Sequence, residues 1–594
     1  MKIKILTAVV ALCLMLSACE NIGGVEKMKE NETPAATEVP EDVDPGLVDI
    51  IGTIWQVTEL SFDGSSESAE TAAGKAVMDI TFTNRATGTS LTIPSFWDGG
   101  VNYKVRFAPT ECGIWDYKST CPEDGTLDGL TGTVGVNAYK GDLLIYLHGF
   151  VTTDLNLKYF IYNDGTPFLY LGDTHWNMYG EELDGKGDRA GDIETESHFK
   201  YIVDRRVSQG FTVYQSEPIN APFGRLTEGI IDEAAVEGFK IADKYYQYIA
   251  EKGLVHANAE LFYTGYMTEE LAADDESLEY LARYWVARFG AYPVIWTLAQ
   301  ECDNDFYNER GDQKFYDAKS NPWLKVAKYI HKYDAYSHPL SGHQESVCYT
   351  TVTGRGTDAS LGRDNNGKSA FSGLSKEYGH TWWAAQWSFP LNTQYYMEVP
   401  KDYWSSGKPA INYEGRYAYL WTKDFGARAQ GWVSFLSGMY GYGYGAADMW
   451  YYKTNYDMKT ESSDGVDTIT VEDKQMYWSE AIELSSGYQM GYLKAFLEEN
   501  DWWKLTPDFD SGQHFLPAEG AYYAAASDEN RTIVIYLYNQ TTAGGTFVNS
   551  EHYNYNYRWF NPRTGEYSES GKTGKTDFSF DKPDAEDWVL VLSA

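Results

Sequence analysis

Between residues 148 and 504 the sequence alternates strand-like and helix-like segments, and this alternation constrains the fold more than any other feature. Short apolar runs bounded by Gly or Pro are separated by longer amphipathic stretches, the pattern of strands that alternate with helices. The predicted strands are PFLYLGD, GFTVYQS, GLVHANAEL, PVIWTLAQE, HPLSGHQE, HTWWAAQWS, KPAINYE and GYGYGAADM. The sequence therefore predicts an α/β fold, a (β/α)8 TIM barrel with inserted loops.

The segments on either side of this region have a different pattern. Residues 49–142 and 505–594 contain short alternating runs interrupted by Gly, Asn and Asp, which predicts a β-sandwich at each end. We expect the two sandwiches to support the barrel and to carry none of the catalytic groups. Cys112 and Cys121 flank GIWDYKST, and the sequence leaves open whether they pair across a hairpin.

The N-terminus is typical of a bacterial lipoprotein. Residues 1–19 have a basic start and an apolar segment, Ile5–Leu16, that is too short for an ordinary membrane span. LSAC, ending at Cys19, resembles the signal in which that cysteine is lipidated, and the alternative is an ordinary secretory signal. Residues 20–48 are rich in Glu, Pro and Thr and are expected to form a disordered tether. We expect an extracytoplasmic or cell-surface protein that contacts the membrane only through a lipid.

Composition narrows the functional classes. The net charge of −38, from 48 basic and 86 acidic residues, disfavours nucleic acid and anionic membrane surfaces as partners. Aromatic residues make up 16% of the chain, which suits β-domains and equally suits stacking against sugar rings. Neither a metal-binding spacing nor a dinucleotide-binding fingerprint is found, so we expect no cofactor and no metal.

Two carboxylates follow predicted strands. Val294–Leu298 is apolar, and Glu301 follows it closely; KPAINYE ends at Glu414. Active sites of TIM barrels lie at the C-terminal ends of the strands, and the fourth and seventh strands face each other across the barrel mouth. Glycoside hydrolysis normally needs two carboxyl groups, about 5.5 Å apart in a retaining enzyme. We predict Glu301 as the general acid/base and Glu414 as the nucleophile; two ordinary loop glutamates are the alternative.

Other polar and aromatic residues recur at the predicted strand ends. Each alone is more often structural, but together they favour a pocket that binds a polyol. The residues expected to bind substrate are Asp173, His175, Trp176, His256, Asn258, Gln300, His343, Gln386, Trp387, Arg416 and Trp450. Arg416 would either keep Glu414 ionised or form a surface ion pair.

Three of these segments resemble a known family. GTPFLYLGDTHWNMYG, VIWTLAQE and KPAINYEGRY are similar to the apiosidase-like family of (β/α)8-barrel glycoside hydrolases. NYKVRFAPTECGIWDYKST resembles a sandwich domain that often precedes glycosidase barrels, and the C-terminal region resembles a domain labelled collagen-binding. The resemblance implies a retaining glycosidase in which Gln300 occupies the place of an Asn that binds the sugar 2-hydroxyl. Known apiosidases have Asp where Glu301 stands, so the resemblance does not extend to apiose as the sugar.

The sequence thus predicts a retaining glycoside hydrolase that acts on complex, plant-type polysaccharide or oligosaccharide. The alternative, from a different class, is a non-catalytic surface lipoprotein that binds glycan or host protein. The two differ in whether Glu301 and Glu414 face one pocket, because a binding protein needs no such pair. Sugar, linkage, anomeric configuration and oligomeric state are left open by the sequence.

Overall fold

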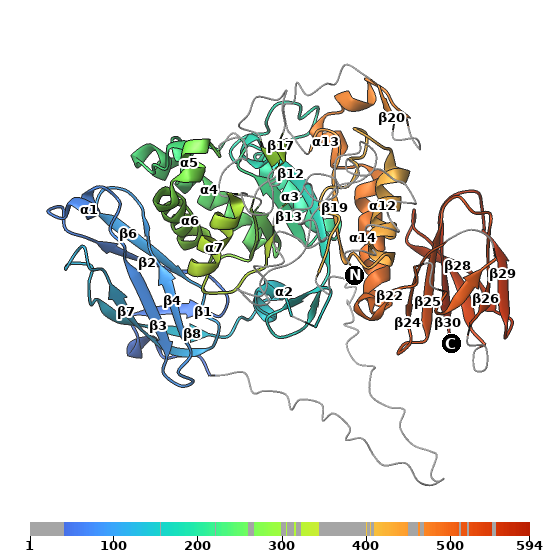
Figure 1. Cartoon of the computed structure of the whole chain (residues 1–594), viewed down its shortest axis with the longest axis horizontal. Helices are drawn as coiled ribbons and strands as arrows, with labels where there is room; N and C mark the ends of the chain where they lie inside the picture. The colour runs from blue at the N-terminus through green and yellow to red at the C-terminus, as the bar shows by residue number, and fades with distance from the viewer. Residues whose placement is uncertain are drawn as a thin grey trace, which may run out of the picture. The chain divides into compact units, whose positions relative to one another are not determined.

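A computed structural model shows the fold (Figure 1). The structure describes residues 41–154, 156–219, 221–258, 267–298, 304–305, 314–315, 322–341, 343, 400, 404, 409–449, 461–463, 468–509, 512–518, 522–548 and 554–594. Residues 41–594 form one compact unit. The expected signal peptide and its Cys19 lie outside the described residues. Among the described residues, no helix is both long and apolar enough to cross a membrane.

The N-terminal β-sheet domain contains two sheets with a common core. The first sheet has the order β1 (Ile50–Thr53), β8 (Thr131–Asn137), β7 (Gly113–Thr120), β3 (Asp79–Asn84) and β4 (Ser90–Pro94). The second has the order β2 (Thr58–Asp63), β6 (Asn102–Phe107) and β5 (Phe96–Trp97), and helix α1 (Ala69–Ala72) accompanies them. All strand pairs here are antiparallel except β1 with β8, which is parallel and differs from the expected pattern.

The two cysteines of this domain are free thiols. Cys112 and Cys121 lie at opposite ends of β7, a single strand of eight residues, so no hairpin brings them together. An extended chain of this length separates them by roughly 30 Å. A disulfide between them, which the sequence left open, is therefore excluded by the strand.

The central region is an α/β domain around a parallel sheet. Its strands have the order β18 (Leu340–Ser341), β15 (Val294–Thr297), β14 (Val255–Asn258), β13 (Val213–Glu217), β12 (Tyr170–Asn177) and β19 (Gly441–Tyr444). Every pair is parallel, and Asn412 adds a parallel bridge to Tyr442 on β19. The described residues therefore form a parallel half-barrel. The sixth predicted strand, HTWWAAQWS, lies outside them.

Helices precede, connect or follow these strands along the chain. They are α2 (Leu144–Leu147), α3 (His198–Ser208), α4 (Glu233–Glu251), α5 (Glu269–Ala273), α6 (Asp275–Phe289), α7 (Trp323–Tyr333), α12 (Asp424–Leu436), α13 (Trp478–Ala481) and α14 (Ser485–Glu499). The 3-10 helices are η1 (Pro45–Leu47), η2 (Met178–Gly180), η3 (Leu226–Glu228), η6 (Asp473–Gln475) and η7 (Trp502–Lys504). Helix α4 illustrates why they form: the Asp232 side chain caps its first turn by accepting from the Ala235 N–H, and buried Phe239 and Tyr246 lie on one face.

Short strand pairs complete the central region. β9 (Val151–Thr152), β10 (Phe160–Tyr162) and β11 (Pro167–Phe168) form a small antiparallel sheet that precedes β12. Two hairpins pair β16 (Asn304–Asp305) with β17 (Lys314–Phe315), and β20 (Ser462–Ser463) with β21 (Thr468–Ile469).

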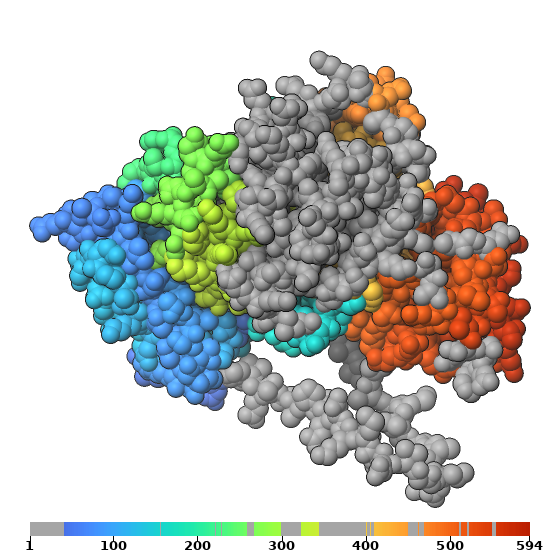
Figure 2. Space-filling model, viewed as in Figure 1, coloured from blue at the N-terminus to red at the C-terminus, as the bar shows by residue number. Residues whose placement is uncertain are grey.

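The C-terminal β-sheet domain is entirely antiparallel. Its larger sheet has the order β22 (Thr506–Pro507), β24 (Tyr523–Ser527), β25 (Thr532–Leu537), β30 (Trp588–Ser593), β27 (Asn556–Asn561) and β28 (Glu566–Lys572). Its smaller sheet has the order β23 (Phe515–Pro517), β26 (Thr542–Phe547) and β29 (Asp577–Asp581). Phe547 and Phe578 of the smaller sheet share a core with Ile535 and Leu590 of the larger one. In the space-filling view, the C-terminal sheets are orange to red and the N-terminal sheets are blue (Figure 2).

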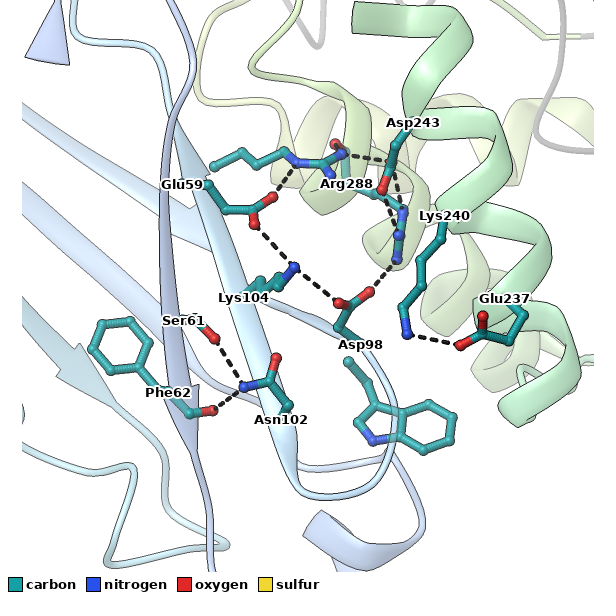
Figure 3. Close-up of polar contacts among 12 residues, drawn as sticks. Glu59, Ser61, Phe62, Asp98, Asn102, Lys104, Glu237, Lys240, Asp243 and Arg288 are labelled. Carbon is teal, nitrogen blue, oxygen red and sulfur yellow. Dashed lines mark hydrogen bonds and ion pairs between the residues drawn. The ribbon is translucent and has the colours of Figure 1, made fainter. Parts of the chain in front are cut away.

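Two buried arginines join the N-terminal sheets to the helices of the central region. Arg106 of β6 and Arg288 of α6 both contact the carboxylate of Asp243 on α4, at 2.8 and 2.6 Å. Arg288 also lies 3.2 Å from Asp98, and Lys104 bridges Asp98 to a glutamate on β2 (Figure 3). Burial acts to raise the pKa of Asp243, but the two guanidinium groups hold it below its usual range. These ion pairs therefore compensate the buried charges where the N-terminal sheets contact helices α4 and α6.

Candidate active site

Glu414 is a buried carboxylate with three side-chain partners, two of them from distant parts of the chain. The Trp176 Nε1–H donates to Glu414 Oε1 at 3.2 Å, and the Tyr417 hydroxyl donates to the same oxygen. His343 Nε2 lies 3.3 Å from Oε2. Only 9% of the Glu414 side chain is exposed. The C-terminal edge of the parallel sheet thus holds one carboxylate in a defined orientation.

Strand alternation explains how these groups meet. Tyr170 and Trp176 lie on one face of β12, and both belong to a core cluster with Tyr413 and Tyr417. Trp176 is the last but one residue of β12, and its Nε1–H also donates to the Tyr417 hydroxyl at 2.7 Å. The Trp176 and His343 rings are nearly parallel, with centroids 5.9 Å apart. Trp176 therefore orients the Glu414 carboxylate through its N–H, and its expected contact with substrate stays a prediction.

These partners determine the charge of Glu414. Burial acts to raise its pKa, but the hydrogen bond and charge of His343 and the hydrogen bonds from Tyr417 and Trp176 hold the pKa below its ordinary value. A carboxylate that accepts from several donors is stabilised in its ionised form. Glu414 is therefore an anion at neutral pH.

The opposite face of β12 carries a second charged cluster. His175 Nε2 lies 2.7 Å from Asp173 Oδ2, and His175 Nδ1 lies 2.6 Å from Glu181 Oε1. Arg206 of α3 contacts the same oxygen of Asp173, and the Tyr214 hydroxyl donates to Glu181 Oε2 at 2.8 Å. Burial acts to lower the pKa of His175, but the two carboxylates raise it to about 9.

Asp173 and His175 therefore make contacts within the protein, and the substrate contacts expected of them from the sequence stay a prediction. Both side chains are almost completely buried. The cluster of Asp173, His175 and Glu181 forms ion pairs, and within the described part of the chain no group of three or more His, Cys, Asp or Glu residues could hold a metal ion. Sequence reasoning missed Glu181, because its role depends on a pairing across a turn.

His256 and Arg416 lie apart from the Glu414 carboxylate in their described contacts. His256 Nε2 lies 2.6 Å from Ser216 Oγ, and burial together with the charge of His175 lowers the pKa of His256 to about 3. The Arg416 backbone N–H donates to Gln430 Oε1, and its guanidinium lies 5.7 Å from the centre of the Trp421 ring. Asn258 ends β14, and nothing further is described for its side chain.

Several predicted site residues lie outside the described residues. They are Glu301, Gln300, Gln386, Trp387 and Trp450. The expected separation of Glu301 and Glu414 therefore stays a prediction.

Two residues at this edge of the sheet were not selected from the sequence. Tyr417 follows Glu414 by three positions, a spacing that gives no signal outside a helix. Glu217 ends β13 and is buried. The strand-end rule applied to GFTVYQSE would have found Glu217, just as it found Glu414.

Three families of known proteins match parts of this chain. The sequence profile described as "Apiosidase-like, catalytic domain" matches residues 155–504, more than half of the chain. The chain belongs to the apiosidase-like family. The profile "Domain of unknown function (DUF5060)" matches residues 52–122, and "Putative collagen-binding domain of a collagenase" matches 516–593. The family resemblance seen in the sequence is thus confirmed.

Solved structures support the same fold. A "putative glycoside hydrolase" from Bacteroides vulgatus ATCC 8482 has a TM-score of 0.59 and 16% identity, over 92% of this chain and 100% of that one. A "glycoside hydrolase family 5" protein from the same organism has a TM-score of 0.53 and 17% identity, over 76% and 95%. At such identities the likeness is one of fold. No protein with a curated description matches this apiosidase-like chain.

Proposed function

We propose that this apiosidase-like protein is a retaining glycoside hydrolase that cleaves glycosidic bonds in complex, plant-type polysaccharide or oligosaccharide. The observation that carries the proposal is Glu414: an ionised carboxylate, held by three side chains, at the C-terminal edge of a parallel sheet. This is the state that a nucleophile of a retaining glycosidase needs. The strand order and the Asn412–Tyr442 bridge support closure of the sheet into a (β/α)8 barrel.

The mechanism assigns separate roles to two carboxyl groups. Glu301, protonated, donates its proton to the leaving-group oxygen while Glu414 attacks the anomeric carbon and forms a glycosyl-enzyme. Glu301, now ionised, then removes a proton from water, and the water oxygen attacks the anomeric carbon and releases Glu414. The donors on Glu414 keep it ionised and hold it in one orientation, so that less ordering is needed during attack.

The substrate and the location of the enzyme belong to the same proposal. Gln300, Gln386, Trp387 and Trp450 end or follow predicted strands and are proposed to bind the sugar. Arg416 and His343, which contacts Glu414, belong to the same proposal. The LSAC motif supports lipidation of Cys19 and a place at the bacterial cell surface. A non-catalytic surface binding protein remains the rival, suggested by the collagen-binding label of the C-terminal profile.

Glycosides with a good leaving group test the two roles separately. Glu414→Ala removes the nucleophile and should abolish turnover of every glycoside. Glu301→Ala should still form the glycosyl-enzyme from a dinitrophenyl glycoside, because such a leaving group needs little acid assistance, but deglycosylation should slow roughly 10²- to 10⁴-fold. Azide should then restore turnover of Glu301→Ala and give a glycosyl azide of retained configuration.

The control is Glu237→Ala, which changes an exposed glutamate of α4 and should keep wild-type activity. The assigned roles would be contradicted if azide rescued neither Glu301→Ala nor Glu414→Ala. They would also be contradicted if Glu301→Ala kept wild-type activity on a natural glycan. A protein that binds glycan but hydrolyses none of a broad panel of aryl glycosides and plant polysaccharides would favour the rival.

A further inference from the structure

The two oxygens of the Glu414 carboxylate have different partners. Oε1 accepts from the Tyr417 hydroxyl and from the Trp176 Nε1–H. Among the described residues, only His343 contacts Oε2, at 3.3 Å. Each oxygen of an ionised carboxylate has about two acceptor sites. The described donors therefore occupy both sites of Oε1, whereas Oε2 keeps a site for another atom.

Tyr417 is the stronger of the two donors to Oε1. The single N–H of Trp176 is shared, because its nitrogen lies 2.7 Å from the Tyr417 hydroxyl oxygen and 3.2 Å from Glu414 Oε1. The indole therefore acts mainly on Tyr417, and it polarises the O–H that points to the carboxylate. Burial, and then the charge of Glu414, raise the pKa of Tyr417 well above its ordinary value. The hydroxyl thus keeps its proton and stays a donor.

The charge of Glu414 changes in opposite directions in the two steps of a retaining mechanism. In the first step one oxygen of Glu414 bonds to the anomeric carbon. The leaving group takes the electron pair of its own bond and the proton of Glu301, and Glu414 becomes a neutral ester. In the second step the ester bond breaks and its electron pair returns to Glu414, while water adds to the anomeric carbon and gives a proton to Glu301. Donors stabilise the anion more than the ester, so by charge alone they oppose the first step and favour the second.

We propose that Oε2 is the oxygen of Glu414 that bonds to the sugar, and that Tyr417 is a positioning residue that promotes the second step by stabilising the charge that returns to Oε1. This inference rests on the proposed function. Within the ester, Oε1 is the carbonyl oxygen and keeps its hydrogen bond from Tyr417. As the bond between Oε2 and the anomeric carbon breaks, negative charge spreads over both oxygens. A donor already in place stabilises this transition state more than it stabilises the ester.

Tyr417→Phe tests this role, with Tyr442→Phe as a matched control. The Tyr442 hydroxyl is also buried, but it donates to the Ala427 carbonyl, at 3.1 Å. The substrate is the dinitrophenyl glycoside that the full chain hydrolyses fastest among those of the common pentoses and hexoses. Its good leaving group makes the first step fast, so kcat reports the second step and kcat/KM the first. Rates are compared at a pH where Glu414 is ionised in every protein.

Tyr417→Phe should affect the two kinetic parameters unequally. We expect kcat to fall roughly 10- to 100-fold, the value of a hydrogen bond to a charged group. The orienting and the charge effects of the donor offset each other in the first step, so kcat/KM should change by less than about 3-fold. KM should fall with kcat, and mass spectrometry of the quenched reaction should find the glycosyl-enzyme accumulated on Glu414. Tyr442→Phe should leave the ratio of kcat to kcat/KM unchanged.

Equal losses of kcat and kcat/KM in Tyr417→Phe, without accumulation of the glycosyl-enzyme, would overturn the inference while the proposed function stood. A crystal structure of the wild-type glycosyl-enzyme, trapped with a deoxyfluoro sugar, gives a test that does not depend on the folding of the variant. We expect the anomeric carbon on Oε2, and a bond to Oε1 would overturn the inference. If none of the sugars formed a covalent bond to Glu414, the proposed function and this inference would both be wrong.

Discussion

Single residues affect how this protein responds to pH, and His175 is one that acts at alkaline pH. Its buried imidazolium lies between Asp173 and Glu181, which raise its pKa to about 9 from about 6.5 in the unfolded chain. A raised pKa gives stability that is fully present below about pH 6.5 and is lost as the pH rises through about 9. The free energy of unfolding should therefore fall by up to about 3 kcal/mol between these values.

Urea unfolding at several pH values between 6 and 9.5 measures this loss. His175→Gln should be less stable at pH 6, because Glu181 loses its cation and Asp173 keeps only Arg206, and its alkaline loss should disappear. His148→Gln, which changes a partly exposed histidine paired with Asp164, should keep the wild-type slope. An unchanged alkaline slope in His175→Gln would show that another group is responsible.

A substitution at Trp176 tests which hydrogen bonds keep Glu414 ionised. Trp176→Phe keeps an aromatic ring but removes the N–H that donates to Glu414 and Tyr417. Fewer donors stabilise the carboxylate less, so the pKa of Glu414 should rise and the acid limb of the kcat/KM profile should move to higher pH. At neutral pH we expect a loss of roughly 10-fold in kcat/KM. A lower rate with the acid limb unmoved would mean that the indole N–H does not control the ionisation of Glu414.

A comparison of the observed strands with the predicted ones shows which parts of the fold the local sequence determines. β15 lies inside PVIWTLAQE, and β13 overlaps GFTVYQS and extends one residue beyond it, because apolar runs bounded by Pro or Gly are typical of buried parallel strands. The parallel β1–β8 pair was not predicted, since short alternating runs look alike in either direction.

The partners of the predicted site residues could be predicted less well. Trp176 was placed correctly at a strand end, but its bond to Glu414 joins residues 238 apart in the chain. No local pattern identifies such a pair. The same holds for Arg106 and Asp243, which are 137 residues apart. What the sequence supplied was the edge of the sheet where polar groups gather, while the donors that tune each carboxylate depend on the packing of distant segments.

Helix α4 carries a buried and an exposed ion pair within two turns, which allows a matched comparison. Asp243→Asn leaves the buried Arg106 and Arg288 without their shared carboxylate and should cost about 3–5 kcal/mol of unfolding free energy. Lys240→Ala removes an exposed pair with Glu237 and should cost less than about 0.5 kcal/mol (Figure 3). Urea unfolding of both variants measures the difference. Equal losses would mean that the junction tolerates unpaired arginines, through relaxation or water.

At the scale of the whole molecule, the terminal sheet domains are extensions of the core of the central region. Residues of the N-terminal sheets, such as Phe96, belong to the same cluster of buried residues as Phe239 and Trp285 of α4 and α6. On the other side, Trp432 of α12 belongs to one cluster with Tyr536 and Val589 of the C-terminal sheets. Shared cores of this kind favour cooperative unfolding, so the catalytic region depends on both neighbours for its stability.

Removal of the C-terminal sheets tests this dependence. A chain that ends at residue 504 loses Tyr536 and Phe560, whose rings lie 5.9 and 5.8 Å from that of Trp432. It also loses Asp587, which accepts two hydrogen bonds from buried Arg428, at 2.9 and 2.6 Å. Newly exposed aromatic surface and an unpaired buried cation both act against folding, so we expect an aggregated or expanded protein that binds a hydrophobic dye. A chain that begins at residue 41 is the control and should behave like the full protein, because it keeps every contact named here. Size-exclusion chromatography with dye fluorescence compares the two. A soluble, monomeric and active chain ending at residue 504 would show that the catalytic region folds without this neighbour, and that the C-terminal sheets serve a separate purpose.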